Sequence, residues 1–200
     1  RRVKLPLSGA HMVANSLAAI CVALELGGTA EEACNSLESF PGVSRRTEII
    51  GESGGVLIVD DYAHHPTEVK ATLSALKHSW LAYQQEKTGA AARGRLFVLF
   101  QPHRYSRTKE LFTEFLRTFS DADVLYLGEI YSAGEAPVPG ISGEALAQAM
   151  QHECCCYSAD LSQAIPAVVK AVRPGDIVAT VGAGSVTKLA PELLTILRAR

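Results

Sequence analysis

The chain has 200 residues, of which 48% are hydrophobic and 20% are charged. This composition is typical of a folded globular protein and excludes disorder over the whole length, because so much apolar surface collapses in water. The formal net charge of −2, from 19 basic and 21 acidic residues, gives no general attraction for nucleic acid or anionic lipid. No uncharged apolar run reaches about 18 residues, so the sequence predicts neither a membrane span nor a nucleic-acid partner.

Five cysteines occur, at Cys21, Cys34 and the run 154–156. An odd number without framework spacing does not fit a disulfide scaffold. Adjacent strand positions face opposite sides, so the run alone cannot surround a metal ion. We therefore expect reduced thiols and a cytoplasmic protein. The chain begins with Arg1 rather than Met and lacks the apolar core of a signal peptide, which predicts a fragment of a longer protein.

Two helices are predicted in the first 40 residues. Apolar residues recur near the helical period from Ala10 to Leu26. Because this segment is apolar on most sides, we expect it to be buried on more than one side. A second helix begins at a Thr29–Glu32 capping box and stops at Pro41-Gly42. Two helices cannot close a core alone, which indicates the end of a domain whose remainder lies elsewhere.

After Pro41-Gly42, short β-rich runs alternate with amphipathic helices. Several runs are apolar at consecutive positions, as in parallel strands buried on both faces. This alternation predicts an α/β fold with an open, mostly parallel sheet. Pro166 and Pro191 are expected to kink or delay their helices, and 84–95 is expected to be an exposed loop. The expected strands are 47–50, 56–60, 96–100, 124–127, 154–157 and 177–181, and the expected helices are 67–81, 108–120, 143–151, 159–172 and 186–199.

Ligands of open α/β sheets bind beyond the carboxyl ends of the strands, and polar residues gather at these ends. Asp61, Tyr62, His64 and His65 follow one strand and precede Pro66. A carboxylate there can accept hydrogen bonds from a ribose, and an imidazole can donate to an anion. The alternative is a simple helix cap. The adjacent histidines do not indicate a metal site, because neighbouring positions do not face each other and no third ligand is near.

A second strand end carries His103, Arg104 and Arg107. Two arginines three positions apart at the start of a helix can grip one carboxylate or phosphate with their guanidinium forks. The helix dipole favours an anion at the same place. Solvated surface arginines are the alternative. The segment 128–135 is a further polar strand end.

Two glycines surround Ala183 at the last strand end, in 182–184. This segment resembles a dinucleotide fingerprint, but Thr187 stands at the position of the final glycine. We favour a tight strand-to-helix turn.

Two polar pairs stand apart from the strand ends. His11 and Asn15 lie one turn apart on an otherwise apolar helix, either as a satisfied core pair or as ligand contacts. Arg45 and Arg46 lie at the junction between the two sequence patterns, as a hinge reaching a phosphate or as a solvated pair.

Three of these stretches resemble the Mur ligases of peptidoglycan synthesis. That family ends its central domain with His-Asn-x-x-Asn, continues with Gly-x-x-Arg-Arg and opens its last domain with Asp-Tyr-Ala-His-x-Pro. The corresponding stretches here are 11–15 (HMVAN), 42–46 (GVSRR) and 61–66 (DYAHHP). The strings 60–68 (DDYAHHPTE), 100–108 (FQPHRYSRT) and 130–135 (IYSAGE) resemble the branch of the family that joins L-alanine to UDP-N-acetylmuramate. The resemblance covers nearly the whole chain.

The resemblance implies two domain parts and one reaction. Residues 1–46 correspond to the C-terminal end of the central ATP-binding domain, with two helices and a hinge. Residues 47–200 correspond to the C-terminal, Rossmann-like α/β domain. ATP phosphorylates the carboxylate of UDP-N-acetylmuramate, and the amine of L-alanine attacks the acyl phosphate. The P-loop and most Mg²⁺ ligands of the family have no counterpart in this chain, so the chain alone is expected to be inactive.

The resemblance also implies roles for single residues. One departure from the family is Met12, which stands where the family has asparagine; a thioether cannot replace the hydrogen bonds of an amide, so weaker nucleotide binding or a substitute neighbour is implied. The implied ATP-binding residues are Asn15, Arg46 and Asp61, the implied catalytic residues are Asp61, His64 and Arg46, and the implied substrate-binding residues are Tyr62, His64, His103, Arg104 and Arg107.

Three other interpretations stay open. Another Mur-type ligase, which adds a peptide to the same sugar nucleotide, shares the His-His-Pro turn but not the string over 101–108. A nucleotide-binding α/β oxidoreductase could be built on 182–184 and predicts NAD binding. A non-enzymatic interaction module predicts no ATP-linked activity.

Overall fold

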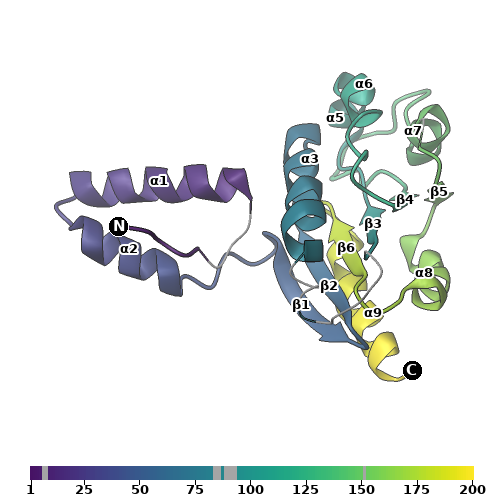
Figure 1. The fold of residues 1–200 in the computed structure, drawn as a ribbon. Helices are drawn as coiled ribbons and strands as arrows, with labels where there is room; N and C mark the ends of the chain where they lie inside the picture. The colour runs from purple at the N-terminus through teal and green to yellow at the C-terminus, as the bar shows by residue number, and fades with distance from the viewer. Residues whose placement is uncertain (6–8, 83–86, 88–93, 151) are drawn as a thin grey trace.

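The computed structural model describes residues 1–5, 9–82, 87, 94–150 and 152–200. Figure 1 shows a helical hairpin beside a body built on one sheet, with helix α3 and strand β1 on the side of the body that faces the hairpin. The loop predicted over 84–95 lies mostly outside the described residues.

The hairpin consists of α1 (Ala10–Glu25) and α2 (Ala30–Ser39). The predicted capping box is present: Thr29 Oγ1 accepts from the Glu32 N–H at 3.2 Å, and Glu32 Oε2 accepts from the Thr29 N–H at 2.9 Å. The expected burial of α1 on several sides is wrong. None of its residues is buried, because α2 covers only one of its sides (Figure 1).

The body contains a six-stranded sheet with the order β1-β2-β6-β3-β4-β5. Strand β1 is antiparallel to β2, and all other neighbours are parallel, which confirms the predicted α/β fold. Every residue of β2, β3 and β6 is buried, as expected for strands rich in consecutive apolar residues. The polar exceptions in these strands are Asp60, Asp61 and Thr180. The strands are β1 (Glu48–Ser53), β2 (Val56–Asp61), β3 (Leu96–Phe100), β4 (Val124–Gly128), β5 (Cys155–Ser158) and β6 (Ile177–Val181).

Helices cover both faces of the sheet, and each face has its own hydrophobic core. Side chains of β2, β3 and β6 alternate between the two cores, as the pleat of a strand requires. One face is covered by α3 (Pro66–Ala75), its π-helical continuation η1 (Leu76–Trp80), α5 (Tyr105–Glu110), α6 (Phe112–Phe115) and α7 (Gly143–Ala149), and the other by η2 (Leu161–Ala164), α8 (Ile165–Ala171), η3 (Ser185–Lys188) and α9 (Leu189–Arg198).

Several helices differ from the predicted ones at their ends. The helix predicted over 108–120 begins at Tyr105 and is interrupted at Leu111, whose φ and ψ of −107° and 20° leave the helical region. The helix predicted over 159–172 opens with the 3₁₀ turn η2, and its α-helical part starts beside Pro166, which delays it as expected. The segment 182–184 forms the predicted tight turn: a Cβ on Gly182 would come within 2.7 Å of the Gln101 carbonyl oxygen.

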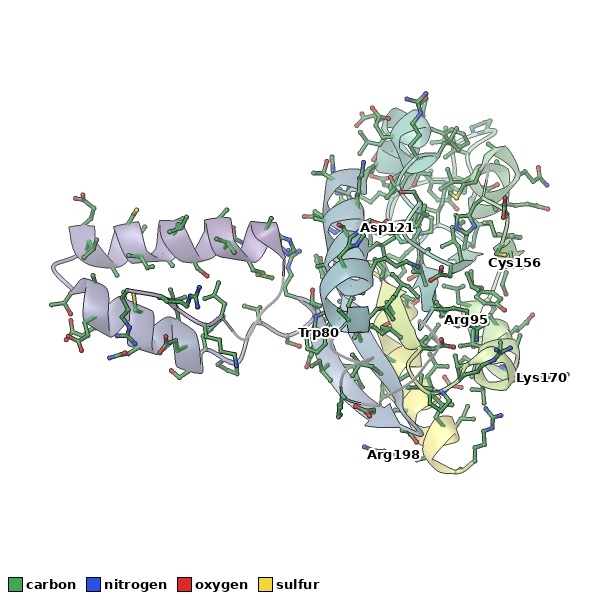
Figure 2. All side chains as sticks on the ribbon, in the orientation of Figure 1. Trp80, Arg95, Asp121, Cys156, Lys170 and Arg198 are labelled. Atoms are coloured by element: carbon green, nitrogen blue, oxygen red, sulfur yellow. The ribbon has the colours of Figure 1, made fainter. Side chains whose placement is uncertain are left out.

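The amino ends of β3 and β6 are held together at the edge opposite the candidate site. Asp176 is buried and accepts from the Arg95 backbone N–H at 2.8 Å and from Arg95 Nη2 at 2.7 Å; Arg95 is labelled in Figure 2. All five cysteines are free thiols. Within the described part of the chain, no helix combines the length and apolar character that crossing a bilayer requires.

Candidate functional site

A cavity of about 660 Å³ lies between the hairpin, the connector to β1 and helix α3. It brings together Asn15 of α1, Arg46 of the connector and Asp61 at the end of β2, the three residues implied for ATP. Their positions in sequence are far apart, so only the fold makes them neighbours. The cavity also has apolar walls, including Met12, Leu37, Phe40 and Ala71, with His11 and Glu68 beside them. A cavity with apolar walls and a few polar groups suits a nucleotide, whose base is flat and whose ribose is polar.

Two adjacent aspartates hold the connector beside this cavity. Asp60 accepts from Arg45 Nε at 3.2 Å, and Arg45 Nη2 donates to the Gly182 carbonyl oxygen at 2.7 Å. Asp61 Oδ2 accepts from the backbone N–H and the hydroxyl of Thr47 at 2.7 and 3.0 Å. Both Arg45 and Thr47 have left-handed φ values, 60° and 50°, a conformation that costs non-glycine residues energy. The aspartates therefore stabilise a strained backbone at the junction.

The Asp61 carboxylate is buried, at 3% exposure. Its Oδ1 accepts from the Ala63 N–H at 2.7 Å. Burial raises the pKa of Asp61 above its usual value, although the hydrogen bonds from Ala63 and Thr47 and the charge of Arg46 oppose the rise. A carboxylate that already accepts three hydrogen bonds from neighbouring residues is held in place, and Asp61 lines the cavity in this position.

Tyr62 connects the two aspartates to a second group of residues. The guanidinium carbons of Arg45 and Arg46 lie 4.8 and 5.6 Å from the centre of its ring, which is within the range of cation–π attraction. The ring of His64 meets the same tyrosine edge-on, with 5.2 Å between the ring centres. Tyr62 is thus packed between the connector and the histidine.

His64 and His103 lie next to each other, with 5.7 Å between ring centres, and Tyr131 stacks on His103 at 5.5 Å with an interplanar angle of 12°. His64 Nδ1 lies 2.9 Å from the Tyr62 carbonyl oxygen. Burial lowers the pKa of His103, and the charge of Arg107 lowers it further. The strand ends of β2, β3 and β4 therefore meet in one aromatic cluster.

The two arginines follow His103 and have different partners. Arg104 adopts a left-handed φ of 72° immediately before α5, and its side chain, half exposed, approaches Glu135 at 3.9 Å. Arg107 Nη1 donates to Nδ1 and to the carbonyl oxygen of His103 at 3.2 and 3.1 Å. Each guanidinium keeps N–H groups that none of these contacts uses, so both can still donate to an anion.

The segment after β4 is hydrogen-bonded to the segment that carries the two arginines. The backbone of Tyr131 makes two hydrogen bonds to this segment. Its N–H donates to the Pro102 carbonyl, and its carbonyl accepts from the Arg104 N–H, each at 2.8 Å. Glu135 accepts from the Ser106 hydroxyl at 2.6 Å and from its N–H at 2.9 Å, and these hydrogen bonds lower the pKa of Glu135. The strained conformation of Arg104 is therefore fixed by its neighbours.

The structure places the implied site residues in two groups. Four further residues have roles in the geometry that the sequence analysis did not assign. Tyr131 and Glu135 were visible only as part of a polar strand end, Glu68 carried a capping signal with His65, and Thr47 carried no signal. The cavity group is Asn15, Arg46 and Asp61, and the cluster group is Tyr62, His64, His103, Arg104 and Arg107.

The described residues do not form a metal site. No group of three or more His, Cys, Asp or Glu side chains among them is placed to hold a metal ion. The implied Mg²⁺ therefore has no ligand set in this part of the chain, and we assign no step of the chemistry to it.

Comparison with known proteins identifies the family. Residues 45–184 match the family model described as Mur ligase, glutamate ligase domain. The chain belongs to the Mur ligase family. This membership agrees with the motifs at 42–46 and 61–66, which lie at the connector and at the end of β2.

Two curated relatives of this Mur ligase chain are named UDP-N-acetylmuramate–L-alanine ligase. The one from Anaeromyxobacter sp. (strain Fw109-5) is 45% identical over 203 residues, covering 99% of this chain and 41% of the relative. The one from Mycobacterium sp. (strain JLS) is 42% identical over 200 residues, covering 100% and 40%. The chain thus spans about two fifths of the length of these relatives.

Solved structures show the same fold. The UDP-N-acetylmuramate–alanine ligase of Thermotoga maritima matches with a TM-score of 0.70 at 23% identity, covering 98% of this chain and 40% of that one. A murein peptide ligase from Psychrobacter arcticus matches with a TM-score of 0.66 at 25% identity, covering 99% and 39%. Both likenesses extend over the hairpin as well as the sheet body.

Proposed function

We propose that this Mur ligase chain is part of an ATP-dependent ligase that joins L-alanine to UDP-N-acetylmuramate in peptidoglycan precursor synthesis. The observation that carries the proposal is the identity of 40% to 45%, over nearly the whole chain, with curated relatives of that name. The reaction forms an acyl phosphate from ATP and the sugar-nucleotide carboxylate. The free amine of L-alanine then attacks the acyl carbon, the bond from this carbon to the phosphate oxygen breaks, and the nitrogen loses one proton as phosphate leaves.

We assign the cavity group to ATP and the cluster group to L-alanine. Residues 1–46 are proposed as the end of the central ATP-binding domain, and 47–200 as the C-terminal domain. The cavity between them supports a nucleotide site in which Asn15, Arg46 and Asp61 contact ATP. A cavity with apolar walls and an arginine in its lining fits an adenine and a charged phosphate chain.

The cluster group is proposed to bind L-alanine. Arg104 and Arg107 offer guanidinium donors for its carboxylate, and Tyr62, His64 and His103 surround the same place. Negative charge gathers on the acyl phosphate and on the tetrahedral intermediate, so fixed donors at this position lower the barrier. Asp61, His64 and Arg46 are proposed as the residues nearest to the reacting groups.

A ligation assay tests the proposal. The full-length product of the gene that carries this chain is incubated with ATP, Mg²⁺ and UDP-N-acetylmuramate, and with L-alanine or a murein tripeptide. We expect ADP, phosphate and an L-alanyl product. Ligation of the tripeptide alone would instead identify a peptide ligase, to which the Psychrobacter fold match points. Absence of any ATP-linked reaction contradicts the proposal.

The isolated chain provides a second test. We expect the purified 200-residue chain neither to hydrolyse ATP nor to ligate alanine, because the phosphate loop and the metal ligands of the family have no counterpart in it. Ligation by the pure chain contradicts this expectation.

A further inference from the structure

The two histidines of the cluster have their ring nitrogens in different situations. In both rings Nδ1 is held by a neighbour. Across the described residues, no hydrogen-bond partner is present for either Nε2, and neither Nε2 is a buried atom. Nε2 is therefore the atom that each ring offers to a ligand. Whether it donates or accepts depends on which nitrogen of the ring carries the proton.

The neighbours of His64 decide which of its ring nitrogens carries the proton. Nδ1 lies 2.9 Å from the carbonyl oxygen of Tyr62 and 3.6 Å from Oε2 of Glu68. A carbonyl oxygen can only accept a hydrogen bond, and so can a carboxylate. Nδ1 of His64 must therefore carry a proton, and Nε2 of the neutral ring is left with a lone pair. His64 offers an acceptor.

The neighbour of His103, Arg107, places the ring proton on the other nitrogen, Nε2. Nη1 of Arg107 lies 3.2 Å from Nδ1, and a guanidinium has only donors. Nδ1 of His103 must therefore accept, and the proton lies on Nε2. Burial and the charge of Arg107 lower the pKa of this ring, which favours its neutral form. His103 offers a donor.

We propose that His64 and His103 form a pair of opposite polarity that orients the amino acid substrate. Nε2 of His64 accepts a hydrogen bond from the amino group, and the Nε2–H of His103 donates to an anionic oxygen. Besides its proposed contact with the carboxylate, Arg107 is a positioning residue that sets the proton of His103. This inference rests on the proposed function, because it names the contacts of the amino acid in that reaction.

The polarity matters because the amino group is the nucleophile. An amine attacks through its lone pair, so a contact that accepts one of its N–H groups leaves the lone pair free. A contact that donates to the nitrogen occupies that lone pair. The opposite arrangement suits the carboxylate or the acyl phosphate, whose oxygens only accept. The tautomers that the structure imposes are thus the productive ones for amide formation.

Imidazole nitrogen spectra test the tautomers without any activity. Long-range ¹H–¹⁵N correlation spectra of the chain with labelled histidine, recorded at about pH 8, above the reference histidine pKa of about 6.5, distinguish protonated from bare ring nitrogens. We expect Nδ1–H for His64 and Nε2–H for His103. Arg107→Met is expected to give a mixture of tautomers at His103 and to leave His64 unchanged. The reverse tautomer at either ring, or no effect of Arg107→Met, overturns the inference.

Paired substitutions test the roles in ligation. The amide of glutamine reaches the position of Nε2, whereas that of asparagine reaches Nδ1. We expect the KM for L-alanine to be about tenfold higher for His64→Asn than for His64→Gln, and likewise for His103→Asn than for His103→Gln. The reason is that each asparagine variant loses one hydrogen bond that the glutamine variant keeps. The KM for ATP should not move. Equal effects of asparagine and glutamine at each histidine overturn the inference.

A neighbouring histidine provides the matched control. His65 Nδ1 accepts from the Thr67 N–H at 3.3 Å and caps α3. Asparagine preserves that acceptor, so His65→Asn should leave both KM values unchanged. If the full-length protein shows no ligation at all, the proposed function fails, and the spectra alone decide the tautomers.

Discussion

Asp61 holds Thr47 in a left-handed conformation at the point where the connector enters the sheet body. One carboxylate oxygen, Oδ2, accepts both the backbone N–H and the hydroxyl of Thr47, at 2.7 and 3.0 Å, and the φ of Thr47 is 50°. The same carboxylate lines the cavity implied for ATP. A residue implied for nucleotide binding thus also fixes the geometry between hairpin and sheet body.

We expect Asp61→Ala to destabilise the fold as well as to slow ligation. The substitution leaves the buried N–H groups of Thr47 and Ala63 without their acceptor, and each such loss costs about 1–3 kcal/mol. The free energy of unfolding of the chain, measured in urea, should fall by this order. The turnover of the full-length enzyme should fall about 100-fold or more if Asp61 positions the nucleotide.

Asp121→Ala is the matched control, because Asp121 is only partly buried and belongs to neither group of the site; it is labelled in Figure 2. Its unfolding free energy should stay within about 0.5 kcal/mol of the original. If Asp61→Ala is as stable as Asp121→Ala, the structural role that we assign to Asp61 is wrong.

Arg46 should act on ATP rather than on alanine. Its side chain lines the cavity and is 43% exposed, with Glu68 at 4.0 Å as a loose partner. Loss of a charge-assisted hydrogen bond to a phosphate costs about 1.5–3 kcal/mol, so Arg46→Ala should raise the KM for ATP about 10- to 150-fold. Steady-state kinetics with each substrate varied in turn measures this. Arg117→Ala, at an exposed position, should change neither constant, and a rise only in the alanine constant contradicts the assignment.

Met12 provides a test in which the substitution should strengthen ATP binding rather than weaken it. It lines the cavity at the position where the family has asparagine, and its thioether cannot donate a hydrogen bond. Met12→Asn should therefore tighten ATP binding to the full-length protein by about two- to tenfold, the value of one neutral hydrogen bond. Isothermal titration calorimetry measures the change. Weaker binding would show that a neighbouring group has replaced the amide.

The sequence predicted the sheet because buried parallel strands leave a clear pattern. Strands β2, β3 and β6 each contain at least three consecutive apolar residues, and their ends were found within one residue. The order of the strands was not predictable, since nothing in the segment 177–181 indicates that it lies between β2 and β3. The interruption at Leu111 was also hidden, because the apolar spacing continues through it.

The site was predicted as residue types but not as contacts. The strand-end rule and the motifs placed Asp61, His64 and Arg107 at the right edge of the sheet. The hydrogen bonds of Thr47 to Asp61 and of Ser106 to Glu135 join residues 14 and 29 positions apart. Such contacts depend on loop conformation, and the left-handed φ of Arg104 has no sequence signature.

The stability of the chain should fall in mild acid through His103. Its pKa in the folded chain lies below the usual value of 6.5, because burial and Arg107 disfavour the charged ring. The unfolded chain then binds more protons, so the stabilising effect is present above pH 6.5 and is lost as the pH falls through the folded pKa. His103→Gln cannot be protonated. Urea unfolding at about pH 7.5 and about pH 5 should show a smaller loss for the variant, and equal losses contradict the prediction.

Arg104 and Arg107 are expected to hold the carboxylate of L-alanine together. They flank the start of α5 beside His103 and Glu135. If either guanidinium is removed, the carboxylate loses a charge-assisted hydrogen bond worth about 1.5–3 kcal/mol. Arg104→Ala and Arg107→Ala in the full-length enzyme should therefore each raise the KM for alanine about 10- to 150-fold.

The ATP constant separates this assignment from phosphate binding at the same position. Neither arginine lines the cavity that holds the cavity group, so both variants should leave the KM for ATP nearly unchanged. Lysine should restore little at either position, because a point charge cannot reproduce the two-point grip of a guanidinium. Steady-state kinetics with alanine and ATP varied separately makes the comparison. If the ATP constant rises while the dependence on alanine stays the same, the two arginines bind phosphate and the carboxylate of alanine is held elsewhere.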